Sequence, residues 1–309
     1  MTKLDETAKG VYVITVTPFK DDGALDLEST DRVIDFYLEK GATGLTVLGV
    51  MGEAPKLTAE EARAYVKRVL ARVKGRVPTV VGVSAPGFAA MKELSESVMA
   101  MGAAGVMVAP AATVKTDDQA FHYFEQAAET LGPHVPFCLQ DHPLATGVQL
   151  PVPVILRVIK HIPSCVMVKH EDWPGPGLAK LAAIRASHAR RVSILAGNGG
   201  GLFLPEELSR GADGAMTGFG YPEMMVDVWN AHVAGDVERA HDLFDAYLPL
   251  ARYEQQSALG LAVRKYMLQK RGALASAAIR KPGPKLSEAD IADIERLVAR
   301  QARRLEELG

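Results

Sequence analysis

The chain has 309 residues, of which 48% are hydrophobic and 23% charged, and its formal net charge at pH 7 is -2. A chain of this length can bury a large core, either as one α/β unit or as two smaller domains. The balanced charge excludes a broad basic surface for nucleic acid, and no stretch approaches the apolar length of a membrane span. The N-terminus has no apolar signal core, and both cysteines lie inside apolar runs. We therefore expect a cytoplasmic protein without disulfides that binds neither nucleic acid nor membranes.

Taken in chain order, short runs rich in Val, Ile and small residues alternate with longer amphipathic segments. The runs predict strands at residues 11–19, 43–49, 77–84, 104–110, 135–140, 164–169, 192–197 and 211–218. The amphipathic segments predict helices at residues 27–40, 59–74, 88–101, 117–131, 152–161 and 177–188. Continuous apolar strands separated by helices indicate a parallel sheet that is covered on its outer face.

This strand and helix pattern favours a closed (β/α)8 barrel, also called a TIM barrel, over an open doubly wound sheet. No G-x-G-x-x-G motif follows the first run, so the main signature of a dinucleotide-binding fold is missing. We predict the barrel over residues 1–221, followed at 222–309 by the last barrel helix and a helical extension without a separate function. The final helix is predicted to begin at Ser287, with Asp290 completing a capping box.

The active site of such a barrel lies at the carboxyl ends of its strands, so the last residue of each run is a candidate. Among these residues Lys169, in the segment VMVKHEDWPG, is the only lysine. Desolvation at that position disfavours the ammonium form, and a neutral amine can attack a ketone to form a Schiff base. The alternative is a lysine that extends to solvent from a strand end, and this segment alone does not decide between the two.

Several motifs occur in an order that resembles one known family. GVYVITVTPFKDDGALD resembles its opening strand, LGVMGEAPKLTAEE its glycine-rich carboxylate-binding turn, and VMVKHED the strand that carries its Schiff-base lysine. LAGNGG, GADGAMT and LSEAD follow in the family's order and spacing. On these motifs the chain is similar to the dihydrodipicolinate synthase and N-acetylneuraminate lyase family over roughly residues 10 to 300.

The resemblance implies that a pyruvate-type 2-oxo acid binds covalently to Lys169 without a cofactor, in a homotetramer. It places the substrate carboxylate on backbone N–H groups of the GVMGE turn, at Val50, Met51 or Gly52. The GNGGG turn after the seventh run has backbone donors that can hold a hydroxyl, carboxylate or phosphate of the substrate. The predicted substrate-binding residues are Gly49, Val50, Met51, Gly52, Gly197, Asn198 and Met216.

The chain also departs from the family's pattern at four polar functions. Apolar residues replace two threonines of the carboxylate turn and a relay tyrosine after the fourth strand, glutamine replaces the acid/base tyrosine, and alanine replaces the synthases' arginine. These positions are Val50 and Met51, Ala111 and Ala112, Gln140, and Ala145. Glutamine can hydrogen bond but cannot exchange a proton near neutral pH. The departures argue against authentic 4-hydroxy-tetrahydrodipicolinate synthase activity and predict a roomier, less polar pocket.

Other groups must then move protons if the chain is an enzyme. Alternation along the fifth and sixth runs points Asp141 and His170 away from the barrel axis. The side chains that it points toward the axis are Cys138, Gln140, His142, Met167, Lys169 and Glu171. His142 and Glu171 are the acid/base candidates among them. Neighbouring acidic and histidine residues lack a fixed ligand spacing, so no metal site is predicted. The predicted catalytic residues are Lys169, Gln140, Glu171 and His142.

The leading hypothesis is a cofactor-free class I lyase or aldolase that acts on pyruvate or a related 2-oxo acid. Its second substrate is expected to be an aldehyde that is larger or more hydrophobic than aspartate semialdehyde. Three alternatives remain open at this point. They are a catalytically silent barrel that binds a 2-oxo acid or a partner, an authentic 4-hydroxy-tetrahydrodipicolinate synthase, and a metal-dependent aldolase.

Overall fold

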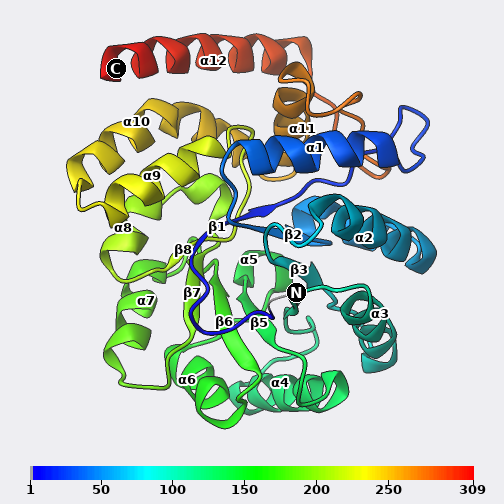
Figure 1. The fold of residues 1–309 in the computed structure, drawn as a ribbon. Helices are drawn as coiled ribbons and strands as arrows, with labels where there is room; N and C mark the ends of the chain where they lie inside the picture. The colour runs from blue at the N-terminus through cyan, green and yellow to red at the C-terminus, as the bar shows by residue number, and fades with distance from the viewer. Residues whose placement is uncertain (1–2) are drawn as a thin grey trace.

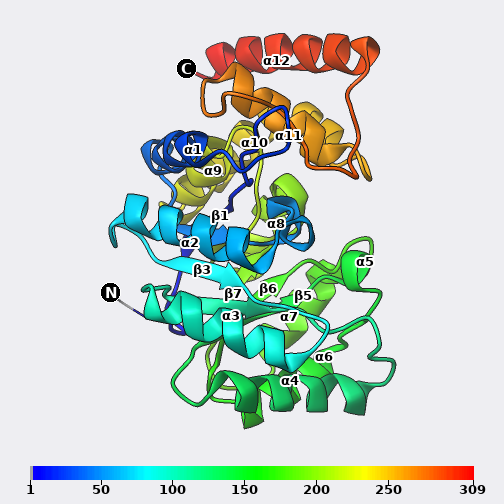
Figure 2. The same ribbon diagram turned by 90° about the vertical axis from the view of Figure 1, so that its right-hand side faces the viewer.

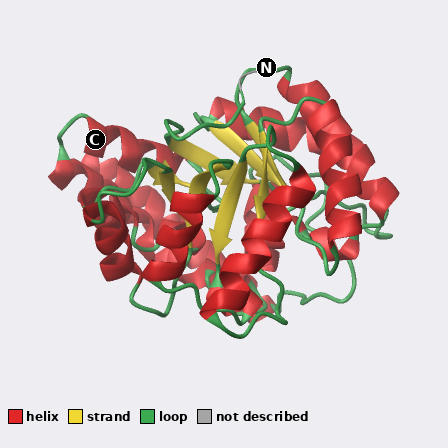
Figure 3. Cartoon of the chain, turned by 90° about the horizontal axis from the view of Figure 1, so that it is seen from below, coloured by secondary structure: helices red, strands yellow, loops and turns green. Residues whose placement is uncertain are grey.

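The structure, a computed structural model, describes residues 3–309 as a closed barrel of parallel strands. Each strand pairs with the next in the chain, and the last pairs with the first. The strands are β1 (Gly10–Ile14), β2 (Gly44–Val47), β3 (Thr79–Gly82), β4 (Gly105–Val108), β5 (Phe137–Asp141), β6 (Cys165–His170), β7 (Ser193–Ala196) and β8 (Gly214–Ala215). Figure 3 shows the strands at the centre of a ring of helices. The predicted (β/α)8 barrel is confirmed.

Helices cover the outside of the barrel. They are α1 (Leu27–Glu39), α2 (Ala59–Val73), α3 (Phe88–Ala100), α4 (Asp117–Leu131), α5 (Pro143–Thr146), α6 (Val152–His161), α7 (Gly177–Ala186), α8 (Leu204–Ser209), α9 (Glu223–Val233), α10 (Val237–Glu254), α11 (Gly260–Lys270) and α12 (Glu288–Leu308). Two 3-10 turns follow β2, namely η1 (Val50–Gly52) and η2 (Ala54–Lys56), and one follows β7, namely η3 (Gly199–Gly201). None of the helices among the described residues is long and apolar enough to cross a membrane.

The first and last strands are shorter than the sequence predicts. The apolar run at 11–19 gives a strand that ends at Ile14, and the run at 211–218 gives only Gly214–Ala215. Residues 15–19 after β1 and 216–218 after β8 are buried without belonging to a strand. An apolar run indicates that its residues are buried, but not that they pair with a neighbouring strand. The chain stays buried beyond the end of a strand, where it enters the mouth of the barrel.

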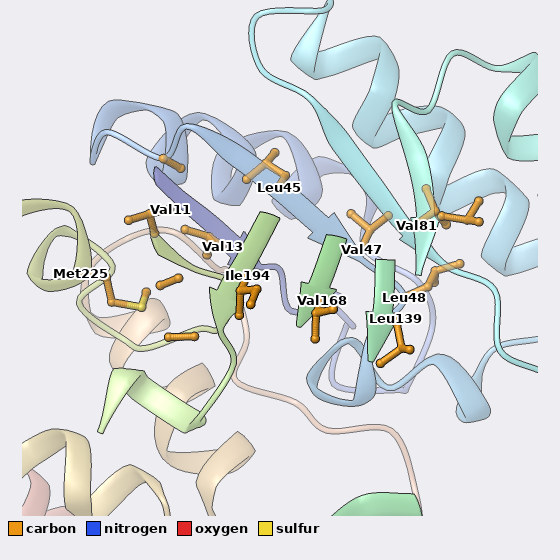
Figure 4. Packing of buried hydrophobic residues seen from close by; sticks show 14 of the residues in the cluster. Val11, Val13, Leu45, Val47, Leu48, Val81, Leu139, Val168, Ile194 and Met225 are labelled. Atoms are coloured by element: carbon orange, nitrogen blue, oxygen red, sulfur yellow. The ribbon is translucent and has the colours of Figure 1, made fainter. Parts of the chain in front are cut away.

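Side chains that alternate along each strand form two apolar layers. Val13 and Val168 belong to the cluster that packs between the sheet and the helices (Figure 4), whereas Ile14 and Met167 belong to the cluster inside the barrel. Each fully buried aliphatic side chain contributes about 1.5–3 kcal/mol relative to an exposed one. Lys169 follows Met167 by two residues, so the same alternation points it along the barrel axis.

The helical extension packs on one side of the barrel. Figures 1 and 2 show α12 as the outermost helix, with α10 and α11 between it and the strands. The predicted capping box is confirmed, because the Ser287 N–H donates to Asp290 at 2.8 Å and the Asp290 N–H donates to Ser287 Oγ at 3.2 Å. Cys138 and Cys165 are buried and free, as predicted.

Candidate active site

Lys169 lies near the end of β6 and points into a cavity at the carboxyl ends of the strands. Its side chain is 6% exposed, and Nζ lies 2.8 Å from Oε1 of Glu171. Glu171 follows by two residues and therefore projects from the same face of the strand. The lysine is thus a buried group in direct contact with a carboxylate, and does not extend to solvent as in the alternative interpretation.

Gln140 holds this carboxylate from the neighbouring strand. Its Cα pairs with that of Lys169 in the ladder between β5 and β6, and its Nε2 donates to Glu171 Oε1 at 2.8 Å. The oxygen that faces the lysine therefore accepts a hydrogen bond from Gln140 and forms the ion pair with Lys169. Because a carboxamide cannot exchange a proton near neutral pH, Gln140 can orient Glu171 but cannot replace a tyrosine in proton transfer.

His142 lies just beyond β5 and faces the same carboxylate from the other side. Its Nδ1 is 3.5 Å from Oε2 of Glu171, longer than a formed hydrogen bond, and its side chain is 20% exposed. Burial lowers the pKa of His142, and the nearby cation of Lys169 acts in the same direction. At neutral pH the imidazole is therefore uncharged and can accept a proton from Glu171 or from a bound molecule.

Gly197, just after β7, makes room for the lysine and carboxylate pair. A Cβ at this position would overlap Cγ of Glu171 and lie 3.0 Å from Cγ of Lys169. Any side chain here would push the two groups apart. Gly197 also lines the cavity, next to Asn198, whose side chain is almost completely buried.

The turn after β2 offers two unused backbone donors. Among the described residues the N–H groups of Val50 and Met51 have no hydrogen-bond partner, whereas Gly52 N–H donates to the Gly49 carbonyl at 3.0 Å. Val50 and Met51 line the cavity, and Gly49 lines an adjoining pocket. Of the three N–H groups that the resemblance offers for a substrate carboxylate, the free ones are therefore those of Val50 and Met51.

The last predicted substrate-binding residue lies deeper than the cavity. Met216 is fully buried in the apolar cluster inside the barrel, with Met167 and Leu195. The residues that reach the cavity from this strand end are Thr217 and Gly218. Sequence periodicity did not separate these positions, because apolar Met216 and polar Thr217 are both buried.

Asp141 and His170 point away from the barrel axis, as alternation predicts. The carboxylate of Asp141 accepts from Lys180 on α7 at 2.8 Å, and His170 Nε2 donates to the Gly177 carbonyl at 2.9 Å. Burial opposes protonation of His170, but its contact with Asp141 raises the pKa overall. These residues bind α7 to the barrel. Within the described chain, no three His, Cys, Asp or Glu residues are placed to hold a metal ion.

The extension contributes two side chains that sequence reasoning missed. Gln255 follows α10 and Arg264 lies in α11, and both line the cavity. The cavity has a volume of about 170 Å³ and is closed further by Leu144, Leu202 and Trp173. One signal was present, since GLAVRKYMLQK places two adjacent cations, Arg264 and Lys265, inside a largely apolar helical segment. A buried arginine commonly indicates a specific partner.

The buried lysine–carboxylate pair and the free backbone donors lie at the carboxyl ends of the strands, where TIM-barrel enzymes have their active sites. The family model described as the dihydrodipicolinate synthetase family matches residues 7–301. The chain therefore belongs to this family, and its fold is that of the family's lyases and aldolases. The resemblance seen in the sequence is confirmed.

Individual relatives are moderately to closely similar. L-2-keto-3-deoxyarabonate dehydratase of Azospirillum brasilense is 29% identical over 90% of this chain and 89% of its own length. A structure described as dihydrodipicolinate synthase from Rhodopseudomonas palustris is 50% identical, covers 97% of this chain and 100% of its own, and has a TM-score of 0.94. YagE of Escherichia coli, solved in complex with pyruvate, is 26% identical over 94% of this chain and 98% of its own, with a TM-score of 0.85.

Proposed function

We propose that the protein is a class I lyase or aldolase that binds pyruvate or a related 2-oxo acid as a Schiff base on Lys169. The observation that carries the proposal is the 2.8 Å contact between buried Lys169 and Glu171 at the end of β6. The pyruvate complex of YagE and the dehydratase named among the relatives support it. No cofactor is required for this chemistry.

The substrate is oriented by its carboxylate. In this proposal the carboxylate accepts from the N–H groups of Val50 and Met51, and the adjacent C2 carbonyl faces Nζ of Lys169. Backbone donors can serve this purpose whatever side chains they carry, so the loss of the family's threonines need not abolish binding.

Glu171 moves the protons of Schiff-base formation. It takes a proton from the Lys169 ammonium group, and the amine then attacks C2 to give a carbinolamine. Protonated Glu171 returns the proton to the C2 hydroxyl, which leaves as water, and the protonated imine remains beside the Glu171 carboxylate. Nitrogen, oxygen and charge balance, because one ammonium and one ketone give one iminium and one water.

The iminium group then serves as an electron sink. Loss of a C3 proton gives an enamine that can expel a C4 hydroxyl as water, and loss of the proton of a C4 hydroxyl breaks the C3–C4 bond instead. Glu171 and neutral His142 are the nearest proton acceptors of the proposed site. Gln140 keeps Glu171 in place through both stages.

The test is reductive trapping. Incubation with pyruvate and borohydride is expected to add a reduced adduct to Lys169, detected by peptide mass spectrometry, and Lys169→Arg is expected to lose it with the fold intact. Lys160→Arg, on the exposed face of α6, is the matched control and keeps the adduct. The absence of an adduct with pyruvate and with every other 2-oxo acid tried would refute the proposal. Turnover that Lys169→Ala abolishes would exclude a silent barrel, and sensitivity to a chelator without trapping would indicate the metal-dependent alternative.

A further inference from the structure

A buried lysine that the proposed mechanism does not use lies behind the ends of β5 and β6. Lys180, on α7, is 5% exposed, and its Nζ lies 2.8 Å from Oδ2 of Asp141 and 2.9 Å from Oδ2 of Asp172. Both carboxylates are buried, and Oδ1 of each has no hydrogen-bond partner among the described residues. One cation therefore holds together two carboxylates that would otherwise repel each other in the protein interior.

These two carboxylates are neighbours of the proposed catalytic groups in the chain. Asp141, the last residue of β5, stands between Gln140 and His142, and Asp172 follows Glu171 directly. Successive side chains of an extended chain point to opposite sides. Accordingly, His142 and Glu171 line the cavity, whereas the two aspartates do not. A shift of either aspartate would also shift the neighbouring group, because the two share a backbone.

The sheet itself does not hold the two segments together at this level. The ladder between β5 and β6 ends at the pair of Asp141 and His170. Among the described residues, the last backbone hydrogen bond between the segments is donated by the Glu171 N–H to the Asp141 carbonyl at 2.8 Å. His142 and Asp172 lie beyond it, and Nδ1 of His142 is 3.5 Å from Oε2 of Glu171. The contact between the two acid/base groups is therefore not set by ladder pairing.

The start of α7 is fixed against the chain after β6. The Gly177 carbonyl accepts from His170 Nε2 at 2.9 Å, and the Lys180 N–H donates to the Pro176 carbonyl at 2.9 Å. A Cβ on Gly177 would lie 2.8 Å from the carbonyl oxygen of Asp172, so helix and loop are in close contact. The ammonium group of Lys180 is thus held at a defined place on the outer side of the sheet.

We propose that Lys180 is a positioning residue that keeps His142 within reach of Glu171. It acts by holding together the aspartates beside these two groups, and it does not itself line the cavity. The inference rests on the proposed function, which gives His142 and Glu171 their part in proton transfer. Loss of the link is expected to slow proton transfer, while the turn after β2 still binds the substrate carboxylate.

The test follows the exchange of the pyruvate C3 hydrogens for deuterium in D2O by NMR. Exchange requires removal of a C3 proton from the iminium form and return of a deuteron to the enamine, which are the steps assigned to the acid/base groups. Lys180→Met is expected to lower the limiting exchange rate about tenfold or more. The half-saturating pyruvate concentration is expected to change less than about twofold, because carboxylate binding does not depend on the link.

Arg185→Met is the matched control, because Arg185 ties the same helix to the opposite end of the barrel. Its guanidinium donates to the carbonyls of Gly211 and Val192 at 2.8 and 2.9 Å and pairs with Asp213. Both variants are expected to lower the temperature of thermal unfolding, but Arg185→Met keeps the wild-type exchange rate. Equal losses of rate in the two variants would show that Lys180 only attaches α7 to the barrel, and would overturn the proposal.

A double variant separates positioning from a general effect on the fold. In Glu171→Gln the group to be positioned is already lost, so adding Lys180→Met is expected to reduce the remaining rate less than about twofold. A further loss as large as in the wild-type background would contradict the proposal. If Lys180→Met does not fold, Asp172→Asn takes its place in every comparison. It removes one charge of the link, keeps the side-chain shape and is expected to lower the rate about threefold or more.

Titration of the His142 imidazole by NMR, assigned with His142→Asn, tests the geometry without any substrate. The carboxylates of Glu171 and Asp141 raise the pKa of His142, whereas burial and the cation of Lys169 lower it. Separation from Glu171 should therefore lower the pKa of His142 in Lys180→Met, as Glu171→Gln does. Loss of the Lys180 charge alone would raise it. A raised or unchanged pKa would overturn the positioning role.

The outcomes distinguish this inference from the proposed function. Exchange in the wild type that Lys180→Met leaves unchanged overturns the positioning role and leaves the Schiff-base proposal standing. Neither trapping nor exchange in the wild type overturns the Schiff-base proposal, and the titration of His142 then decides the positioning role by itself.

Discussion

At the scale of single residues, the site combines a lysine with a carboxylate that the sequence had offered only as a candidate. Glu171 contacts Lys169 directly, and Gln140 binds the same oxygen from the position where the family's pattern has a tyrosine. In the proposed mechanism Glu171, just after β6, therefore transfers the protons that a tyrosine at the end of β5 transfers in the family's pattern. Gln140, which stands at the tyrosine's position, orients Glu171.

Glu171→Gln tests this assignment. The amide preserves the shape of the side chain but cannot carry a proton, so the rate of adduct formation with pyruvate is expected to fall about 10²- to 10⁴-fold. The rate is measured by quenching timed samples with borohydride, and the amount trapped after long incubation is expected to stay near that of the wild type. Glu125→Gln, an exposed carboxylate on α4, is the control. An unchanged rate in Glu171→Gln would move the proton transfer to another group.

At the scale of elements, α11 connects the extension to the turn that follows β2. Lys265 is completely buried, and its Nζ donates to the Thr17 carbonyl at 2.8 Å, the Ala278 carbonyl at 2.8 Å and Glu53 Oε1 at 2.5 Å. Glu53 ends η1 with a φ of 54°, in the left-handed region. Burial lowers the pKa of Lys265, and the Glu53 carboxylate opposes that shift. The turn with the free N–H groups is thus fixed by a residue more than 200 positions away in the chain.

Lys265→Met is expected to weaken substrate binding more than chemistry. Removing one partner of a buried ion pair costs about 3–5 kcal/mol of stability, and the loss releases the turn that presents Val50 and Met51. The half-saturating pyruvate concentration should rise about tenfold or more, while the limiting trapping rate changes little. Lys56→Met removes a partly exposed partner of the same Glu53 and is expected to have a much smaller effect on both stability and binding. Equal effects of the two variants would contradict this role for Lys265.

At the scale of the whole molecule, one buried carboxyl makes stability depend on pH. Burial raises the pKa of Glu207 to about 8, although His170 and the Asn198 amide act in the opposite direction. In the unfolded chain this carboxyl loses its proton near pH 4, so between there and about pH 8 the folded state binds the extra proton. Stability from this group is therefore full at low pH and is lost as the pH rises through that window.

Glu207→Gln removes this dependence. The wild-type free energy of unfolding is expected to fall by up to about 1.4 kcal/mol per pH unit between pH 5 and 8 relative to the variant, since one proton is involved. Urea unfolding at several pH values measures the difference. Glu206→Gln, at the neighbouring position on α8, is the control and should follow the wild type. Parallel curves for wild type and Glu207→Gln would show that Glu207 is ionised in the folded state.

The sequence by itself determined the barrel, the order of its strands and the position of the lysine. Apolar runs alternating with amphipathic segments specify strands and helices through local burial, and a period of two residues places Lys169 with Glu171 and sends Asp141 and His170 outward. These features depend on neighbours in the chain, so a local pattern is enough to predict them. The homotetramer implied by the family resemblance stays a prediction, and light scattering would check it.

Only the tertiary structure decided which residues complete the cavity. The contact of Gln140 with Glu171 depends on the register between two strands, and the close fit of Gly197 depends on a third. Gln255, Arg264 and Lys265 reach the site from helices outside the barrel units, and no periodicity within those helices indicates what they face. Their positions result from the packing of the extension on the barrel. Contacts between residues far apart in the chain are set by this global packing, and a local sequence pattern does not predict them.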